Sequence, residues 1–173
     1  MKRLYFCRHG LSELGKAGLW AGSTDTPMAP EGRNQARAAG LIADELEIDC
    51  IISSPLLRAL ETAQIIADVI SYPQDKIEID PLVVERDFGP LEATHYNSDF
   101  DVDSIEGPDG PESAESVLER ARKTYEHVCS IESQSILIVS HGAFGRALRH
   151  VIYPDIPFDK HGRFENARIV QLI

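Results

Sequence analysis

The sequence predicts an α/β fold, a three-layer α/β/α sandwich around a mostly parallel sheet with a short lid segment. Two observations lead to this prediction. Short runs of β-branched and aromatic residues alternate along the chain with longer segments whose apolar residues recur at helical spacing. The short runs are apolar on both faces, which is typical of parallel strands covered by helices on each side. At 173 residues, the chain is expected to form a single domain over residues 1–173.

The predicted elements follow one another in strand and helix order. The predicted parallel strands cover residues 4–7, 50–52 and 135–139. The predicted helices cover residues 32–47, 55–70 and 113–131, and a fourth begins at Gly142 or Ala143 and ends near Val151. The clearest helix is 55–70, because its apolar residues step by three and four and form one stripe. Residues 167–173 are expected to form a last strand at or near a sheet edge.

The segment from residue 84 to residue 112 differs from the rest of the chain. It is rich in turns and in carboxylates, with Asp99, Asp101, Asp103, Glu106 and Asp109. About 30 residues with little regular pattern inside a compact domain usually form a lid or a binding loop. We therefore expect this segment to cover a ligand site and, with Trp20 and its neighbours in residues 15–22, to determine specificity. His95 in this segment is a candidate for substrate contact.

Composition limits the classes of partner. Lys and Arg together number 17 against 28 Asp and Glu, and the net charge of −11 disfavours binding to nucleic acid or to an anionic membrane. No apolar run approaches the roughly 18 residues of a membrane span, and the N-terminal residues do not resemble a signal peptide. Cys7, Cys50 and Cys129 show no C-x-x-C spacing, which is typical of reduced thiols in a cytoplasmic protein. The oligomeric state is left open.

Cationic side chains follow three of the predicted strands. Arg8 and His9 follow the first strand, Arg58 comes shortly after the second, and His141 follows the third. Ligands bind beyond the carboxyl ends of parallel strands, so these four side chains are expected to form one cluster at that edge. In a chain of net charge −11, such a cluster predicts a local pocket for an anion.

Two guanidinium groups and two imidazoles suit a phosphoryl group. Guanidinium groups bind its oxygens bidentately, and neighbouring cations keep one imidazole neutral so that it can attack phosphorus. A second, cationic histidine is expected to stabilise the charge on the equatorial oxygens, and the amides near Gly142 are expected to add N–H donors. Glu85 is the best candidate for protonating the leaving alkoxide, although it could instead be a surface residue paired with Arg86. No step requires a metal or another cofactor.

Four motifs occur in a fixed order along nearly the whole chain. They are Arg8-His9-Gly10, Ser53-Ser54-Pro55-Leu56-x-Arg58, Glu85-x-x-x-Gly89-x-x-Glu92 and Val139-Ser140-His141-Gly142, and Gly22-x-x-Asp25-x-Pro27 supports the first. This series resembles the histidine phosphatase superfamily, the phosphoglycerate mutase-like proteins. The resemblance implies that His9 is the phosphorylated nucleophile and that Glu85 is the proton donor and acceptor. It also implies a phosphate pocket made by Arg8, Arg58 and His141, with Ser12 and Gly22 beside the phosphate.

Departures from the family pattern bear on the reaction. Gly15 stands where many members have Asn, Ala93 replaces a common Gly, and Phe88 stands where mutases tend to have Tyr. The chain also lacks the longer insertions of mutases, which must keep water from the phosphohistidine. The sequence therefore predicts a metal-independent phosphatase for a small phosphorylated metabolite, with a phosphohistidine at His9. A phosphoglycerate mutase and a catalytically silent phosphate-binding module are the alternatives.

Charge in the lid suggests the kind of substrate. Residues 85–111 carry many carboxylates and few Lys or Arg side chains. We therefore expect monophosphates with neutral or cationic tails to be preferred over bisphosphates. A cysteine-based phosphatase is excluded as an alternative, because such an enzyme needs Arg six positions after the cysteine, whereas Glu13 stands six positions after Cys7.

Overall fold

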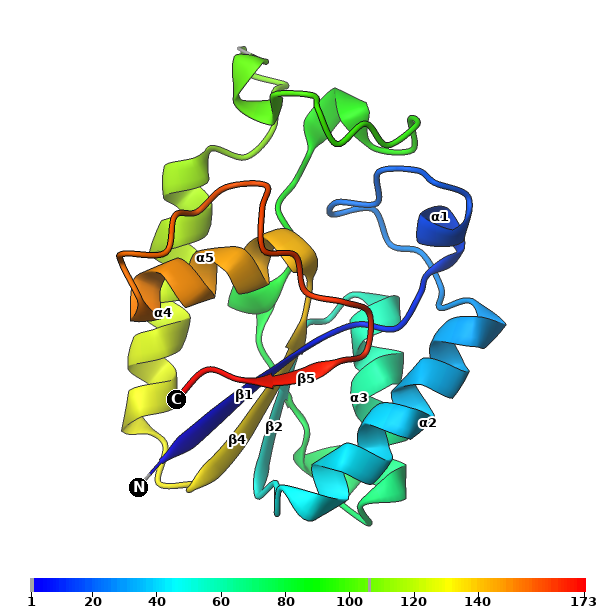
Figure 1. The fold of residues 1–173 in the computed structure, drawn as a ribbon, viewed down its shortest axis with the longest axis vertical. Coiled ribbons are helices and arrows are strands. Elements are labelled where there is room, and N and C mark those ends of the chain that lie inside the picture. Colours follow the sequence, from blue (N-terminus) through cyan, green and yellow to red (C-terminus); the bar gives the residue numbers. More distant parts are fainter. Residues whose placement is uncertain (1, 106) are drawn as a thin grey trace.

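The computed structural model of the chain describes residues 2–105 and 107–173. A five-stranded sheet of order β3-β2-β4-β1-β5 forms its middle layer (Figure 1). The strands are β1 (Arg3–Arg8), β2 (Cys50–Ser53), β3 (Glu78–Ile79), β4 (Ser135–Ser140) and β5 (Ile169–Gln171). Strands β1 to β4 pair in parallel, and β5 pairs antiparallel with β1 at the edge of the sheet.

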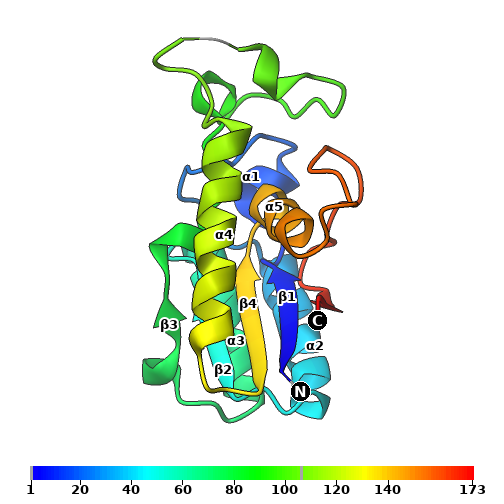
Figure 2. The same cartoon turned by 90° about the vertical axis from the view of Figure 1, so that its left-hand side faces the viewer.

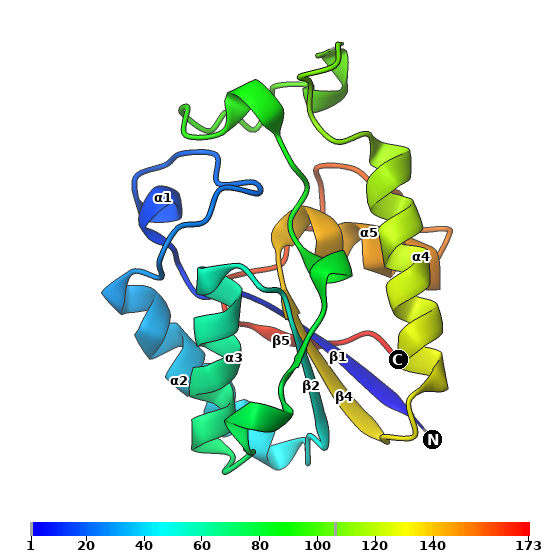
Figure 3. The same cartoon turned by 180° about the vertical axis from the view of Figure 1, so that it is seen from behind.

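Helices cover both faces of this sheet. Helices α2 (Pro30–Glu45) and α3 (Leu57–Val69) pack together on one face, and α4 (Ala114–Ser130) and α5 (Gly142–Ile152) on the other (Figures 1 and 3). The predicted α/β/α sandwich with a mostly parallel sheet is confirmed. None of the described helices is both long enough and apolar enough to cross a membrane.

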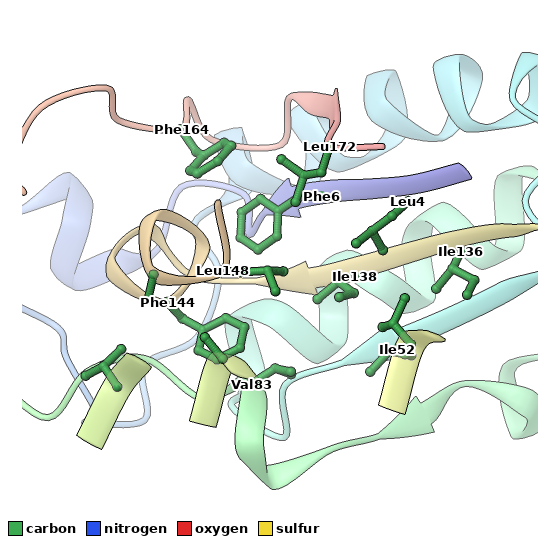
Figure 4. Packing of buried hydrophobic residues seen from close by; sticks show 14 residues of the cluster. Leu4, Phe6, Ile52, Val83, Ile136, Ile138, Phe144, Leu148, Phe164 and Leu172 are labelled. Carbon is green, nitrogen blue, oxygen red and sulfur yellow. The ribbon is translucent and has the colours of Figure 1, made fainter. Parts of the chain in front are cut away.

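Side chains of the central strands alternate between two hydrophobic cores. One core packs against α4 and α5 and includes Leu4, Phe6, Ile136 and Ile138 (Figure 4). The other packs against α2 and α3 and includes Tyr5, Cys7, Leu137 and Val139. Successive residues of a strand point to opposite faces, so each of these strands must be apolar throughout.

Some elements differ from the prediction. Helix α1 (Glu13–Lys16) and strand β3 were not predicted, because α1 has four residues and both residues of β3 are exposed, so neither carries an apolar pattern. Helix α3 begins at Leu57 because Leu56 is still extended, with ψ of 134°. The last strand covers only three of the residues expected, and Ala167 lies outside it with a φ of 50°.

The strand register explains why the site forms at one edge. Arg8 lies opposite Ser140, and Ser53 lies opposite Val139, so three strands end at the same level. The residues that follow these ends are therefore neighbours. The described part of segment 84–112 lies beyond this edge (Figure 2) and contains the short 3-10 turns η3 (Gly89–Leu91) and η4 (Val102–Ser104). Glu106 of the predicted lid lies outside the described residues.

Candidate active site

A pocket of about 670 Å³ lies at the carboxyl edge of the sheet. Its walls come from the loop after β1, the start of α3, the lid segment, the start of α5 and the segment between α5 and β5. The predicted site residues that line it are Arg8, His9, Ser12, Gly22, Arg58, Glu85 and Gly142. His141 is fully buried beside His9, with 5.1 Å between the ring centroids. The structure thus brings all the predicted site residues together.

His9 is held as a neutral imidazole with a defined tautomer. Its Nδ1 lies 2.7 Å from the carbonyl oxygen of Gly10, which can only accept, so Nδ1 carries the proton. Nε2 is therefore the unprotonated nitrogen, and Arg58 Nε donates to it at 3.2 Å. Burial, followed by the charges of Arg58 and Arg8, holds the pKa of His9 well below its ordinary value. The expected neutral imidazole is present, although burial contributes more than the neighbouring cations.

Arg58 is fixed by backbone carbonyls as well as by His9. Its side chain is buried, with 1% of the residue exposed, and its terminal nitrogens donate to Gly22 O at 2.6 Å and to Thr24 O at 2.9 Å. Each terminal nitrogen keeps one further N–H. Arg8 and Arg58 are therefore not equivalent as phosphate-binding groups, because three of the five Arg58 N–H donors already have partners.

The loop that orients Arg58 is itself held by Glu92. This carboxylate accepts the N–H of Ser23 at 2.7 Å and the N–H of Thr24 at 2.8 Å, and it also accepts both side-chain hydroxyls. A Cβ at Gly22, where φ is 51°, would overlap Glu92 Oε1. Sequence reasoning assigned Glu92 no role, although its place in the third motif was a signal.

His141 lies behind His9 and is also uncharged. Its Nε2 is 2.8 Å from Ser54 Oγ, which accepts the Leu56 N–H at 3.3 Å and can donate its own proton to the imidazole. Nδ1 is then an N–H donor, and it has no partner among the described residues. The pKa of His141 is held well below its ordinary value, first by burial and then by Arg58, His9 and Arg8. The prediction that this second histidine is cationic is wrong for this arrangement of charges.

Glu85 lies at the N-terminus of α5. Its carboxylate accepts the backbone N–H groups of Ala143 at 3.1 Å and Phe144 at 3.0 Å. The expectation that amides near Gly142 donate to phosphate does not hold for Ala143 and Phe144, because Glu85 takes these two N–H groups. The alternative pairing of Glu85 with the Arg86 side chain is also wrong, since the Arg86 guanidinium pairs with Asp103.

The remaining predicted residues have local roles. The Ser12 hydroxyl accepts the Gly15 N–H at 3.1 Å at the start of α1. Arg8 donates to Phe164 O at 3.1 Å, and its buried Nε has no partner among the described residues. Burial raises the pKa of the Cys7 thiol to about 12, so it is no nucleophile. Within residues 2–105 and 107–173, no group of three His, Cys, Asp or Glu side chains is arranged to hold a metal.

Sequence reasoning missed one wall of the pocket. The segment between α5 and β5 contributes Phe158, Asp159, Lys160 and Arg163, and α5 contributes Arg146. The expectation about substrate charge considered the lid alone and omitted these cations. The direction of β5 accounts for this wall. Because β5 runs antiparallel to β1, the chain enters β5 at the carboxyl edge of the parallel strands. The segment before β5 therefore lies beside the site.

Aromatic side chains form another part of the pocket wall. Trp20 packs against Phe88 at 4.7 Å and against Tyr96 at 4.6 Å between ring centroids. The predicted contributions of Trp20 and of the acidic lid to the pocket agree with its lining, which includes Asp101 and Asp103. His95 pairs through its backbone with Leu19 and is absent from the lining that the described residues form.

A comparison with known proteins identifies the family. The family model described as the histidine phosphatase superfamily (branch 1) matches residues 4–172. The chain belongs to the histidine phosphatase superfamily. The predicted resemblance is thereby confirmed, and superfamily members named as phosphatases and as mutases support a phosphatase or mutase enzyme.

Two superfamily relatives and one solved structure show the range of similar proteins. A Hydrogenobacter thermophilus protein provisionally named phosphoserine phosphatase 2 is 33% identical over 82% of this chain and 74% of its own length. An Enterobacter protein provisionally named phosphoglycerate mutase GpmB is 32% identical over 82% of this chain and 70% of its own. The solved mycobacterial glucosyl-3-phosphoglycerate phosphatase in complex with VO3 has a TM-score of 0.84 and 24% identity, and the match covers 99% of this chain and 92% of that one. This last likeness concerns the fold.

One departure from the superfamily pattern falls at a backbone position that favours glycine. Ala93, which stands where Gly is common, has a φ of 61°, in the left-handed region that favours glycine. Its N–H donates to Trp20 O at 2.8 Å and so ties the lid to the loop after β1. Ala93 keeps this backbone conformation at the cost of some strain.

Proposed function

We propose that the protein is a metal-independent phosphatase that hydrolyses small phosphomonoesters through a phosphohistidine at His9. The observation that carries the proposal is the state of His9, whose Nε2 is unprotonated and whose Nδ1 proton is held by Gly10 O. Two guanidinium groups, Arg8 and Arg58, adjoin this nucleophile and would bind the phosphoryl oxygens. Its reduced cysteines Cys7, Cys50 and Cys129 support a cytoplasmic setting.

In the first step, His9 Nε2 forms a bond to phosphorus while the bond from phosphorus to the ester oxygen breaks. Glu85, in its carboxylic acid form, gives its proton to that oxygen, so the leaving group departs as an alcohol. The Arg58 Nε–H that caps the Nε2 lone pair must release it before attack. We expect this N–H to move to a phosphoryl oxygen, so that substrate binding itself frees the nucleophile.

In the second step, a water oxygen forms a bond to phosphorus and its proton passes to the Glu85 carboxylate. The bond between phosphorus and His9 breaks, which returns neutral His9 and orthophosphate. The amides of Ala143 and Phe144 fix the direction of the Glu85 carboxyl group through both steps. His141 adds an N–H donor at Nδ1.

An assay with p-nitrophenyl phosphate tests the enzyme against the silent phosphate-binding module. We expect turnover without added metal that survives EDTA, and we expect His9→Ala to reduce kcat by at least about 10³-fold. His127→Gln is the matched control, because His127 is half-buried on α4 and pairs with Glu78, and neither residue lines the pocket. Turnover retained in His9→Ala, or no turnover in wild type, contradicts the proposal.

A mass balance tests hydrolysis against the mutase reaction. With 3-phosphoglycerate as the probe, we expect orthophosphate release to exceed formation of 2-phosphoglycerate. Faster isomerisation than phosphate release contradicts the hydrolytic assignment and supports the mutase alternative.

A further inference from the structure

We propose that Arg146, with Arg163 farther out, forms a second anion site in the pocket, and that this site binds a carboxylate carried by the leaving group of the substrate. The proposal rests on the proposed phosphatase function and names its substrate class. It replaces the expectation of neutral or cationic tails, which depended on the lid alone.

Six cationic side chains line the pocket, against the four carboxylates of Glu85, Asp101, Asp103 and Asp159. Arg146, Lys160 and Arg163 line it together with Arg8 and Arg58. No ion pair within 4.0 Å joins any of these five cations to a carboxylate in the described part of the chain. Arg86, by contrast, is already paired with Asp103. In a chain of net charge −11, cations left without carboxylate partners in one pocket indicate anion binding.

Arg146 lies beside the helix turn that holds the proposed proton donor. Its Nη1 donates to Gly142 O at 3.2 Å, so the guanidinium folds back over the start of α5. The next amides of this helix turn hold the carboxylate of Glu85, the proposed proton donor to the ester oxygen. A Cβ on Gly142 would lie 3.7 Å from both Arg146 Nη1 and Arg8 Nε, so Arg146 borders the phosphate site.

The donors of Arg146 are largely unused. Its Nε is buried and has no hydrogen-bond partner among the described residues, and Nη1 has the Gly142 carbonyl alone. A guanidinium with free N–H groups on adjacent nitrogens binds a carboxylate through two parallel hydrogen bonds. Glu85 and Asp159 act on the charge of Arg146, and so do the cations Arg149 and Arg86, so the choice between a monoanion and a dianion falls to the experiment below.

Arg163 extends the site toward the mouth of the pocket. It is exposed, and its guanidinium lies 4.9 Å from the ring centroid of Tyr96, which packs on Trp20. This contact holds a cation beside the aromatic wall. A short leaving group would therefore meet Arg146 first, and a longer one would reach Arg163.

The test compares two esters of nearly equal size, 2-carboxyethyl phosphate and its amide, 2-carbamoylethyl phosphate, by orthophosphate release. We expect the wild type to prefer the carboxylate by about 10-fold or more in kcat/KM, the value of one charged hydrogen-bond pair. Arg146→Met keeps the volume and removes the charge, and should reduce this ratio about 10-fold. Arg146→Lys should restore part of it. Arg168→Ala, on an exposed residue outside the pocket, should leave the ratio unchanged.

The outcomes separate this proposal from the proposed function. A wild-type ratio near one overturns it, and so does an equal loss for both esters in Arg146→Met, which would make Arg146 a phosphate ligand. Preference for propane-1,3-diol bisphosphate over both esters would assign the site to a dianion and overturn it too. If no ester is hydrolysed, the binding of the two esters to His9→Asn is measured by calorimetry. Tighter binding of the carboxylate ester that depends on Arg146 would support the second anion site although the phosphatase function fails. Equal binding of the two esters would reject both the site and the phosphatase function.

Discussion

At the scale of single residues, the chemistry of His9 depends on the backbone around it. Gly10 O takes the Nδ1 proton at 2.7 Å and thereby leaves Nε2 as the nucleophilic nitrogen. The backbone of His9 is fixed as well, because its N–H donates to Ser140 O and its carbonyl accepts from Asn166 Nδ2. The imidazole is therefore oriented before any substrate arrives, which lowers the cost of reaching the transition state.

The neutrality of the two buried histidines predicts a pH dependence of stability. Below the ordinary histidine pKa of 6.5, the unfolded chain binds protons at His9 and His141, whereas the folded chain does not because its pKa values are depressed. Their contribution is therefore complete above pH 6.5 and is lost as the pH falls toward the folded pKa values. Each histidine should lower the free energy of unfolding by about 1.4 kcal/mol per pH unit in this window.

Urea unfolding of the wild type and of His9→Asn between about pH 5 and pH 7 checks this prediction. The slope of the unfolding free energy against pH should be smaller in the variant by the amount that one proton contributes. Equal slopes for the two proteins would show that His9 titrates normally in the folded state.

At the scale of elements, the site depends on a chain of contacts from the lid to the nucleophile. Glu92 holds the backbone of Ser23 and Thr24, the loop carbonyls of Gly22 and Thr24 hold Arg58, and Arg58 donates to His9. Burial raises the pKa of Glu92, but the hydrogen bonds from Thr24, Phe88 and Ser23 outweigh it and lower the pKa overall. Glu92 is therefore a charged acceptor that positions Arg58 from outside the pocket.

Replacing Glu92 tests this positioning role. Glu92→Gln turns one acceptor oxygen into a donor that faces the donors of Ser23 and Thr24, at a cost of about 1.5–3 kcal/mol. We expect kcat/KM for p-nitrophenyl phosphate to fall by about 10-fold or more. Glu119→Gln, which alters an exposed carboxylate paired with Arg122 and Lys123 on α4, is the control. Wild-type kinetics in Glu92→Gln would show that Arg58 needs no such support.

The sequence was sufficient to predict the elements that carry a regular apolar pattern. Strands β1, β2 and β4 are continuous apolar runs, and their order along the chain placed Arg8, His9, Arg58 and His141 at one edge. The sequence was not sufficient to predict structure that depends on strand pairing or on single hydrogen bonds. Two examples are β3, whose two residues are exposed, and the amides after Gly142, which Glu85 takes. Periodicity contains no information about which acceptor a helix amide finds.

At the scale of the whole molecule, charge is unevenly distributed. The chain has a net charge of −11, yet Arg8, Arg58, Arg146, Lys160 and Arg163 converge on one pocket. These cations come from segments far apart in the sequence, so they can be close together only in the folded chain. The repulsion between these cations lowers the free energy of unfolding, and an anion bound in the pocket should raise it again.

Orthophosphate should therefore stabilise the folded protein. At about 100 times its dissociation constant, a ligand adds about 2.7 kcal/mol. For a chain of this length, that corresponds to a rise in Tm of about 5–11 °C. Sodium chloride at equal ionic strength is the control for screening. Arg8→Gln should lose most of the rise, and an equal rise in chloride or in this variant would mean that phosphate does not bind in the pocket.

The most direct test of the account is to trap the covalent intermediate. The enzyme is mixed with a phosphomonoester and quenched under alkaline conditions, because a phosphorus–nitrogen bond is labile in acid, and the modified peptide is then mapped. A phosphohistidine mechanism predicts one phosphoryl group on Nε2 of His9, and none in His9→Ala. A phosphoryl group on any other residue, or turnover with no modified residue at all, would contradict it.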